Sequence, residues 1–286
     1  MKENSLKGAV CVVGAGTMGW GIAQVFAATG YKVYLCDQTE EQAIRGKQAM
    51  HKVLDKQVEK GRMEQAAKDQ LLDRVVPCLI DAIGDDCVFA IEAVFESPAV
   101  KKIVFEQLEA KLPAEALITT NTSSLSITEL ACYLKDPGRL AGMHFFNPAP
   151  LMSLVEVIGG ARTSEETLTR VCELATELGK TPVRVNEAPG FVVNRLLIPM
   201  VNEAIFLVSE GVADIESIDQ AMLLGASHKI GPLQLGDLIG LDVCLAIMEV
   251  LHQETGDDKY RPAPLLRKMV RAGKLGRKTK QGFYEY

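Results

Sequence analysis

The sequence predicts an α/β fold: a Rossmann-like, doubly wound and mainly parallel sheet with an inserted helical hairpin, followed by an all-helical C-terminal domain. Three observations predict it. Apolar runs of strand length alternate with helical patterns over the first part of the chain, which is typical of a parallel sheet covered by helices. A glycine-rich turn follows the first of these runs, and beyond Gly190 only helical patterns remain.

The strands are expected where short apolar runs lie between turn residues. These runs occupy residues 9–13, 32–36, 75–78, 88–93, 117–120, 140–144, 154–158 and 181–185. Between the second and third runs, residues 39–60 and 63–72 have helical patterns divided by Gly61. Because glycine commonly ends a helix, we expect these two helices to form the inserted hairpin.

Helix starts are marked by three capping-box patterns. Thr39, Ser126 and Thr163 are each followed three residues later by Glu or Gln. A hydroxyl at the helix cap accepts a bond from the third backbone N–H, and the later side chain bonds back to the cap. We therefore expect helices to begin after each of these residues. A further helix, at residues 19–29, is expected to end at Gly30.

The pattern changes at the turn Asn186-Glu-Ala-Pro-Gly190. We therefore place the Rossmann-like domain at residues 1–187 and an all-helical domain at residues 188–286. Residues 191–210 are apolar on nearly all sides, which predicts a buried helix. Shorter helical segments follow to about Gly273.

Composition excludes several classes of protein. The chain has 286 residues, 48% of them apolar, and a formal net charge of −6, so it can form a full core and is not suited to nucleic acid or an anionic membrane. The sequence contains no run of about 18 apolar residues, so we expect no membrane span. We also expect no secretory leader, because no apolar segment precedes the first strand. The seven cysteines include no C-x-x-C pair. We expect a cytoplasmic protein without disulfides or a metal site.

A glycine motif predicts a nucleotide site. Gly14-Ala-Gly16-Thr17-Met18-Gly19 follows an apolar strand and opens a helical pattern. In that context Gly14 allows a tight turn, Gly16 lets the backbone approach a pyrophosphate at the helix N-terminus, and Gly19 lets helix and strand pack closely. The alternative is a glycine-rich turn without function.

Asp37 indicates which dinucleotide binds. It ends the second predicted strand, where a carboxylate can accept hydrogen bonds from the adenosine ribose hydroxyls. The same charge would repel a 2′-phosphate, so we expect NAD rather than NADP as the cofactor. The alternative is an exposed aspartate of the turn.

A histidine and a glutamate form the candidate catalytic pair. His144 lies at the carboxyl end of a predicted strand, where ligands bind in open α/β sheets, and histidine is the commonest base near neutral pH. Glu156 lies inside the apolar run 154–158, where an unpaired carboxylate is costly. A bond between them would fix the imidazole tautomer and stabilise its charged form. A purely structural histidine is the alternative.

Two more polar residues are candidates for substrate contacts. Ser123, in Asn121-Thr-Ser-Ser124, follows another predicted strand, and its hydroxyl can bond a substrate oxygen. A polar loop before a helix cap explains it equally simply. Asn194 begins an apolar helix, where a buried amide needs partners, either a substrate carbonyl or the backbone.

Taken together, the motifs resemble one family, the short-chain L-3-hydroxyacyl-CoA dehydrogenases of the bacterial 3-hydroxybutyryl-CoA dehydrogenase type. The resemblance covers the whole chain. It is carried by the glycine motif, Asn121-Thr-Ser-Ser124, His144-Phe-Phe-Asn-Pro148, Leu154-Val-Glu-Val-Ile158, Pro189-Gly-Phe-Val-Val-Asn-Arg195 and Gly282-Phe-Tyr284.

The resemblance implies a role for each of these residues. His144 would be the general base with Glu156 as its partner, and Ser123 and Asn194 would hydrogen-bond the substrate. The glycine motif and Asp37 would hold NAD. The other implied cofactor positions are Glu96, Lys101 and Asn147, near the nicotinamide half, and Lys278, near the C-terminus. The family also implies a homodimer formed through the helical domain.

The chain departs from the family pattern at three places. The usual Val-Glu-Asn is replaced by Phe95-Glu-Ser97, which removes an amide and puts one cofactor contact in doubt. Trp20 occupies a usually small position after the glycine loop, and Lys229 stands where proline is common. None of the three belongs to the proposed acid–base pair.

An acyl-CoA substrate is strongly anionic and needs basic contacts. Lys52, Lys56 and Lys60 recur at helical spacing on one face of the predicted hairpin, with Arg62 just beyond. We expect Lys56 and Lys60 to contact the CoA phosphates. An ordinary solvated face explains the same pattern.

The predicted reaction is (S)-3-hydroxybutanoyl-CoA + NAD⁺ = acetoacetyl-CoA + NADH + H⁺. Three alternatives stay open: a related dehydrogenase of a free hydroxy acid or sugar acid, a β-hydroxyacid dehydrogenase with a lysine catalyst, and a non-catalytic NAD-binding protein. The His144–Glu156 spacing disfavours the second, and the complete set of polar candidates disfavours the third.

Overall fold

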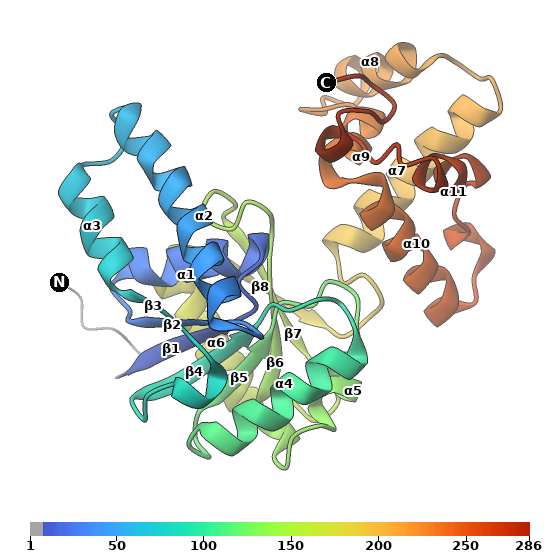
Figure 1. Ribbon diagram of the computed structural model, residues 1–286. Helices are drawn as coiled ribbons and strands as arrows, with labels where there is room; N and C mark the ends of the chain where they lie inside the picture. The colour runs from blue at the N-terminus through green and yellow to red at the C-terminus, as the bar shows by residue number, and fades with distance from the viewer. Residues whose placement is uncertain (1–7) are drawn as a thin grey trace. The chain divides into compact units, whose positions relative to one another are not determined.

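An eight-stranded sheet forms the centre of the first part of the chain (Figure 1). The computed structural model describes residues 8–286, so the expectation about a leader falls on residues 1–7, outside the described part. The strands are β1 (Ala9–Val13), β2 (Val33–Cys36), β3 (Val75–Cys78), β4 (Cys87–Glu92), β5 (Leu117–Thr120), β6 (Leu140–Phe145), β7 (Leu154–Gly159) and β8 (Thr181–Asn186). Every predicted strand is present, so the predicted α/β class is confirmed.

The sheet is doubly wound, in the order β3-β2-β1-β4-β5-β6-β7-β8. The chain moves outward from β1 to β3 and then returns to β4 on the other side of β1, which creates the crevice where such sheets bind ligands. β6 and β7 pair antiparallel, because residues 146–153 are too few for a parallel crossover. β8 runs parallel to β7.

Helices cover both faces of this sheet. They are α1 (Thr17–Thr29), α2 (Glu40–Glu59), α3 (Gln65–Asp73), α4 (Pro98–Lys111), α5 (Ile127–Ala131) and α6 (Glu165–Glu177), with short 3₁₀ turns η1 (Ile80–Ala82) and η2 (Pro137–Arg139). α2 and α3 lie side by side and project beyond the sheet, which confirms the inserted hairpin.

Two of the three predicted capping boxes start helices as expected. Thr39 and Gln42 exchange both bonds of the box, at 3.3 Å and 3.2 Å between the paired atoms. Ser126 Oγ accepts from the backbone N–H of Glu129. The third prediction was wrong by one residue: Ser164 caps α6 by accepting from Thr167, because Thr163 Oγ1 is already bonded to Gly160 and Leu140.

The core of this part of the chain explains why α1 is held firmly on the sheet. β1 is buried at every position, as expected for a central parallel strand. The Phe26 ring of α1 packs against Tyr31 and Phe89, at centroid distances of 5.8 Å and 5.6 Å. These contacts fix the glycine loop that joins β1 to α1.

The chain divides into two compact units, with the boundary between Glu187 and Ala188. The helices of the second unit are α7 (Val193–Ser209), α8 (Ile215–Gly225), α9 (Pro232–Ile239), α10 (Leu241–Thr255) and α11 (Pro264–Arg271), with 3₁₀ turns η3 (Asp258–Tyr260) and η4 (Arg277–Thr279). Its described residues contain isolated β-bridges but no named strand, which confirms an all-helical unit.

The prediction that the helix at 191–210 is buried on nearly all sides was wrong. α7 begins at Val193, after Phe191 in a left-handed conformation, and buries one face around Ile198, Val201 and Ile205. Leu196 on another face is 71% exposed. An apolar sequence therefore does not by itself show that a helix is covered within one chain.

Two buried carboxylates organise the end of the second unit. Asp237 accepts bonds from the backbone N–H groups of Phe283 and Tyr284, at 3.0 Å and 2.9 Å. Asp219 accepts from Leu233 at 2.8 Å and from the Tyr284 hydroxyl at 2.9 Å. A Cβ at Gly282 would lie 2.0 Å from Asp237 Oδ1, so the terminal Gly-Phe-Tyr motif is a structural anchor.

Five of the seven cysteines are buried packing residues, whereas Cys132 is exposed and Cys172 is half-buried. All seven are free thiols, and Cys11, Cys36 and Cys78 lie together with Sγ separations of 3.7 Å and 3.5 Å. Burial raises the pKa of Cys11, which keeps this thiol protonated and unreactive.

Within residues 8–286, none of the helices has the length and apolar composition that crossing a bilayer requires.

Candidate active site

The glycine loop between β1 and α1 leaves one side open. Gly14 has φ +99°, and a Cβ there would lie 2.5 Å from the Ala93 carbonyl oxygen. A Cβ at Gly19 would lie 1.6 Å from the Gly14 oxygen, whereas one at Gly16 would meet nothing within 4 Å. Two glycines are therefore required by packing, and the third faces space that a ligand can occupy.

The start of α1 is suited to an anion. Its cap residue, Gly16, makes no side-chain capping bond, and the first turn holds no acidic residue. Backbone N–H groups at a helix N-terminus attract phosphate groups. Thr17 lines the adjoining pockets, while Met18 packs against the sheet core, so any contact of Met18 with a cofactor is made by its backbone.

Asp37 lies at the end of β2, beside this loop. Its Oδ2 accepts from the Ala15 backbone N–H at 2.7 Å, which fixes the carboxylate next to the open space. A pocket of about 270 Å³ begins here, lined by Ala15, Gly16, Thr17, Trp20, Asp37, Gln42, Arg45, Gly46 and Ala49. This size and lining fit the adenosine part of NAD. Sequence reasoning did not identify Arg45.

His144 and Glu156 are opposite each other on β6 and β7. His144 Nδ1 and Glu156 Oε2 are 2.8 Å apart, with 7% and 1% of the side chains exposed. The chain reverses direction between β6 and β7, so these two residues, separated in the sequence, face each other as a buried pair. Because Nδ1 is committed to Glu156, the bond assigns the proton-accepting role to Nε2.

The serine loop after β5 is held by Glu96. Glu96 Oε1 accepts from the Ser123 backbone N–H at 2.9 Å and from Thr122 Oγ1 at 2.6 Å, and Ser123 Oγ lies 3.4 Å away. Asn121 Oδ1 accepts from the Phe145 backbone N–H at 2.8 Å, which ties the loop to β6 next to His144. Ser123, Glu96 and His144 therefore belong to one edge of the sheet.

Lys101 does not face a pocket. Its side chain is 1% exposed, and its Nζ lies 2.7 Å from Glu92 Oε1 and 3.1 Å from Glu96 Oε2. The Lys101 ammonium is therefore occupied by these two carboxylates. Sequence reasoning missed Glu92, although a glutamate inside the apolar run 88–93 is the same signal that identified Glu156.

A second pocket, of about 440 Å³, lies between α1, the hairpin and the loop after β6. Its lining is mainly apolar, with a few polar groups: Thr17, Trp20, Gly21, Gln24, Val53, Gln57, Arg62, Met63, Asn147, Pro148, Ala149, Pro150 and Leu151. Gln24 Oε1 is buried there and accepts no hydrogen bond from the described residues. An orphaned acceptor in a pocket wall favours a ligand that donates one.

The remaining predicted residues lie outside these two pockets. Lys56 and Lys60 are exposed at the end of α2. Asn194 lies in the first turn of α7, in the second unit. Lys278 Nζ is 2.6 Å from Asp242 Oδ2, also in the second unit, so an acidic side chain already balances its charge.

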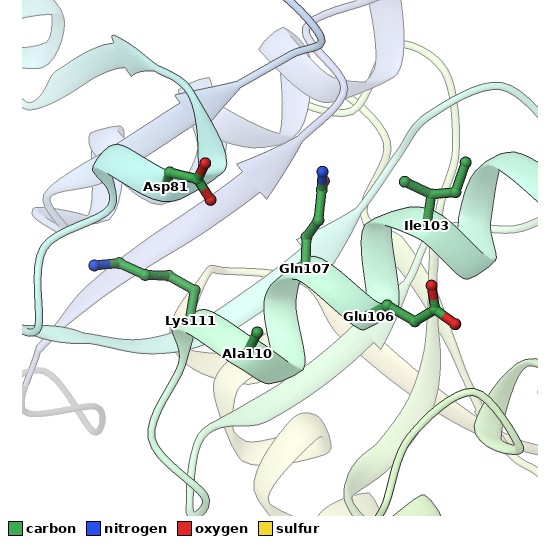
Figure 2. Close-up of a pocket in the computed structure, with 6 residues that line it drawn as sticks. All are labelled: Asp81, Ile103, Glu106, Gln107, Ala110 and Lys111. Carbon is green, nitrogen blue, oxygen red and sulfur yellow. The ribbon is translucent and has the colours of Figure 1, made fainter.

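A third hollow, of about 370 Å³, lies along the outer side of α4 (Figure 2). It is lined by Asp81, Ile103, Glu106, Gln107, Ala110 and Lys111. Since α4 runs back from the carboxyl end of β4, these residues lie toward the amino ends of the strands. This is the edge where open α/β sheets do not bind their ligands.

Comparison with known proteins places the two units in one family. Residues 9–188 match the 3-hydroxyacyl-CoA dehydrogenase NAD binding domain, and residues 190–286 match the C-terminal domain of the same enzymes. The chain is 52% identical over 275 residues to a probable 3-hydroxybutyryl-CoA dehydrogenase of Deinococcus radiodurans, covering 96% of this chain and 99% of the relative.

Two further proteins extend this similarity. A 3-hydroxybutyryl-CoA dehydrogenase of Clostridioides difficile is 51% identical over 277 residues, covering 97% of this chain and 99% of the relative. The crystal structure of (S)-3-hydroxybutyryl-CoA dehydrogenase from Ralstonia eutropha aligns with a TM-score of 0.93 at 45% identity, covering 99% of each chain.

Proposed function

The chain belongs to the 3-hydroxyacyl-CoA dehydrogenase family, and from this premise we propose how its residues carry out (S)-3-hydroxybutanoyl-CoA + NAD⁺ = acetoacetyl-CoA + NADH + H⁺. It is an NAD-dependent oxidoreductase. The observation that carries the proposal is the buried His144–Glu156 pair, 2.8 Å apart, at the sheet edge that also holds the glycine loop.

His144 is the general base. Its Nε2 takes the proton of the 3-hydroxyl group, and bound NAD supplies the acceptor for the hydride that leaves C3. Glu156 holds the ring by its Nδ1 and stabilises the imidazolium that forms. In the reverse direction, His144 returns the proton to the 3-keto oxygen. A positioned base of this kind contributes about 10²–10⁴-fold.

Ser123 and Asn194 hydrogen-bond the substrate. The Ser123 loop follows β5, and the Glu96 carboxylate holds it by the backbone. That arrangement commits the backbone of the loop to the protein and keeps the hydroxyl near the edge that bears His144. Asn194 contributes an amide from the first turn of α7. We assign both residues to the substrate carbonyl and hydroxyl oxygens.

The cofactor-binding residues of this chain fit NAD. Open space above Gly16 and the uncapped start of α1 suit the pyrophosphate, and Asp37 suits the ribose hydroxyls of the adenosine. We assign Glu96 and Asn147 to the nicotinamide half of the cofactor, with Lys101 acting there through Glu96. Lys278 is assigned to the cofactor by family position alone.

The CoA part of the substrate needs cations and an apolar channel. We assign Lys56 and Lys60 on α2 to its phosphates. The 440 Å³ pocket, which the hairpin also lines, suits the apolar arm of CoA. This arm carries amide N–H groups, and Gln24 Oε1 can accept a hydrogen bond from one of them.

The second unit is assigned to a homodimer interface, because α7 exposes apolar side chains such as Leu196. Free thiols throughout the chain favour the cytoplasm.

The test is the oxidation of NADH by acetoacetyl-CoA, measured beside free acetoacetate and with NADPH as a second donor. We expect rapid turnover only of the thioester with NADH, and loss of that turnover in His144→Gln. Turnover of free acetoacetate instead would favour a free hydroxy-acid dehydrogenase. Silence with every substrate, despite NADH binding, would favour a non-catalytic NAD-binding protein.

A further inference from the structure

Glu92 is a buried carboxylate that the reaction described above does not use. Its side chain is fully buried at the end of β4. Lys101 Nζ lies 2.7 Å and 2.8 Å from its two oxygens, the Val94 backbone N–H donates to Oε1 at 2.7 Å, and Thr120 Oγ1 donates to Oε2 at 2.7 Å. Burial raises the pKa of Glu92, whereas Lys101, Thr120 and Val94 act to lower it. These three donor groups make four hydrogen bonds to one carboxylate, an arrangement characteristic of its ionised form.

Lys101 is shared between two carboxylates. The same ammonium lies 3.1 Å from Glu96 Oε2. Burial raises the pKa of Glu96, but Lys101, Thr122 and Ser123 outweigh that effect, so the pKa lies below its usual value. Two carboxylates and one ammonium leave one negative charge uncompensated. Because Glu92 and Lys101 are out of contact with water, that charge is weakly screened.

The triad of Glu92, Lys101 and Glu96 lies on one side of the strand-order reversal. Asp37, at the end of β2, marks the adenosine side, and β4 lies on the other side of β1. A dinucleotide crosses such a crevice, so its second nucleoside lies over the ends of β4 and β5. The nicotinamide ring carries a positive charge when oxidised and none when reduced.

We propose that Glu92, acting through Lys101 and Glu96, sets a net negative charge beside the nicotinamide site and makes the protein bind NAD⁺ more tightly, relative to NADH, than a neutral site would. The inference rests on the proposed function for the location of the nicotinamide. Its consequence is that the equilibrium between bound reactants is shifted toward NAD⁺ and the 3-hydroxyacyl thioester. Glu92 is thus a positioning residue that favours reduction of the ketone on the enzyme.

The test measures the dissociation constants of NAD⁺ and NADH separately, by quenching of the single tryptophan, Trp20, which lines the nucleotide pocket. In Glu92→Gln the triad becomes neutral, and we expect the ratio Kd(NADH)/Kd(NAD⁺) to fall roughly tenfold. In Glu92→Gln/Lys101→Met the net charge returns to minus one, and we expect the ratio to return toward that of the wild type.

Thr120→Val is the matched control. It removes the hydrogen bond to Glu92 and the one that Thr120 Oγ1 accepts from the Thr122 backbone N–H, without changing any charge. The ratio should therefore stay as in the wild type. Glu96→Gln removes the same charge from a partly exposed position and covers the case in which Glu92→Gln does not fold. A fall of the ratio in Glu96→Gln would then support the proposal.

An unchanged ratio in folded Glu92→Gln or in Glu96→Gln would overturn the inference. So would an equal fall in Thr120→Val, because the effect would then be one of shape. These outcomes can be distinguished from failure of the proposed function, which fails if acetoacetyl-CoA is not reduced. If the wild type reduces the thioester but the ratio Kd(NADH)/Kd(NAD⁺) does not change with the charge of the triad, only the inference is refuted.

Discussion

Each unit of the chain buries two carboxylates almost completely, but their partners differ in kind. In the first unit Glu92 bonds Lys101 and Glu156 bonds His144, so each faces another ionisable side chain. In the second unit Asp219 and Asp237 bond backbone N–H groups of α9 and of the C-terminal tail, together with the neutral hydroxyls of Tyr284 and Tyr286. We infer from this difference that Glu92 and Glu156 adjust charge at the proposed active site, whereas Asp219 and Asp237 fix the path of the chain.

The largest effect should come from breaking the acid–base pair itself. His144→Gln keeps a polar side chain of similar size but removes the base, and we expect kcat to fall about 10²–10⁴-fold. The midpoint of thermal unfolding should move little. Steady-state rates with acetoacetyl-CoA and NADH, together with thermal unfolding, check this. A kcat within about threefold of wild type would remove His144 from the mechanism.

At the C-terminal anchor we expect a loss of stability and not of activity. Asp237→Asn replaces an acceptor of backbone bonds by a group that also donates, and we expect the free energy of unfolding to fall by about 2–3 kcal/mol. The activity of the folded protein with saturating substrate should be kept. Urea unfolding measures the loss, with Asp258→Asn, which is exposed, as the control. Unchanged stability would contradict the structural role.

Cofactor choice should depend on one charge in the first unit. Asp37→Ala removes the carboxylate that we assign to the adenosine ribose, and we expect kcat/KM for NADH to fall about tenfold, since hydrogen bonds to charged groups contribute about 1.5–3 kcal/mol. Use of NADPH should rise, because Arg45 lines the same pocket. If Asp37→Ala/Arg45→Ala used NADPH as well as Asp37→Ala does, Arg45 would have no part in it.

Exposed charges should have smaller effects than buried ones. Lys56→Ala/Lys60→Ala should raise KM for the CoA thioester about two- to fivefold, with kcat unchanged, because exposed ion pairs are weak. Lys102→Ala, on α4, is the matched control and should leave KM unchanged. A KM for the double variant equal to that of the wild type would indicate that these lysines belong to an ordinary solvated face and do not contact CoA.

The smallest effect concerns acid stability. The pKa of Glu96 is lowered in the folded chain, so its ionised form stabilises the protein above the ordinary carboxyl range, and this contribution is lost as pH falls through the lowered value. The stability difference between wild type and Glu96→Gln should therefore be constant between about pH 6 and 8 and shrink below about pH 4. Urea unfolding across that range checks it, and a difference that grows in acid would be incompatible with it.

The sheet could be predicted from the sequence because each strand is a short apolar run, and the glycine motif identified the crevice. The His144–Glu156 pair was predictable because a carboxylate in an apolar strand needs a partner. The same argument applied to Glu92, but its partner Lys101 comes from a helix, and no local pattern joins the two.

Other features depend on packing that local sequence does not specify. The start of α6 was misplaced by one residue, since Thr163 and Ser164 are both good caps and only the fold commits Thr163 elsewhere. The orphaned acceptor of Gln24 becomes visible only when α1, the hairpin and the loop after β6 enclose a pocket. The exposed side of α7 likewise follows from which helices surround it.

The contrast between the two kinds of buried carboxylate is tested most directly by two isosteric variants measured in the same way. For Glu156→Gln and Asp237→Asn, kcat with acetoacetyl-CoA and the midpoint of thermal unfolding would be determined on the same preparations. We predict that Glu156→Gln loses mainly kcat and Asp237→Asn loses mainly stability. Equal losses of both quantities in both variants, or the opposite assignment, would contradict the account.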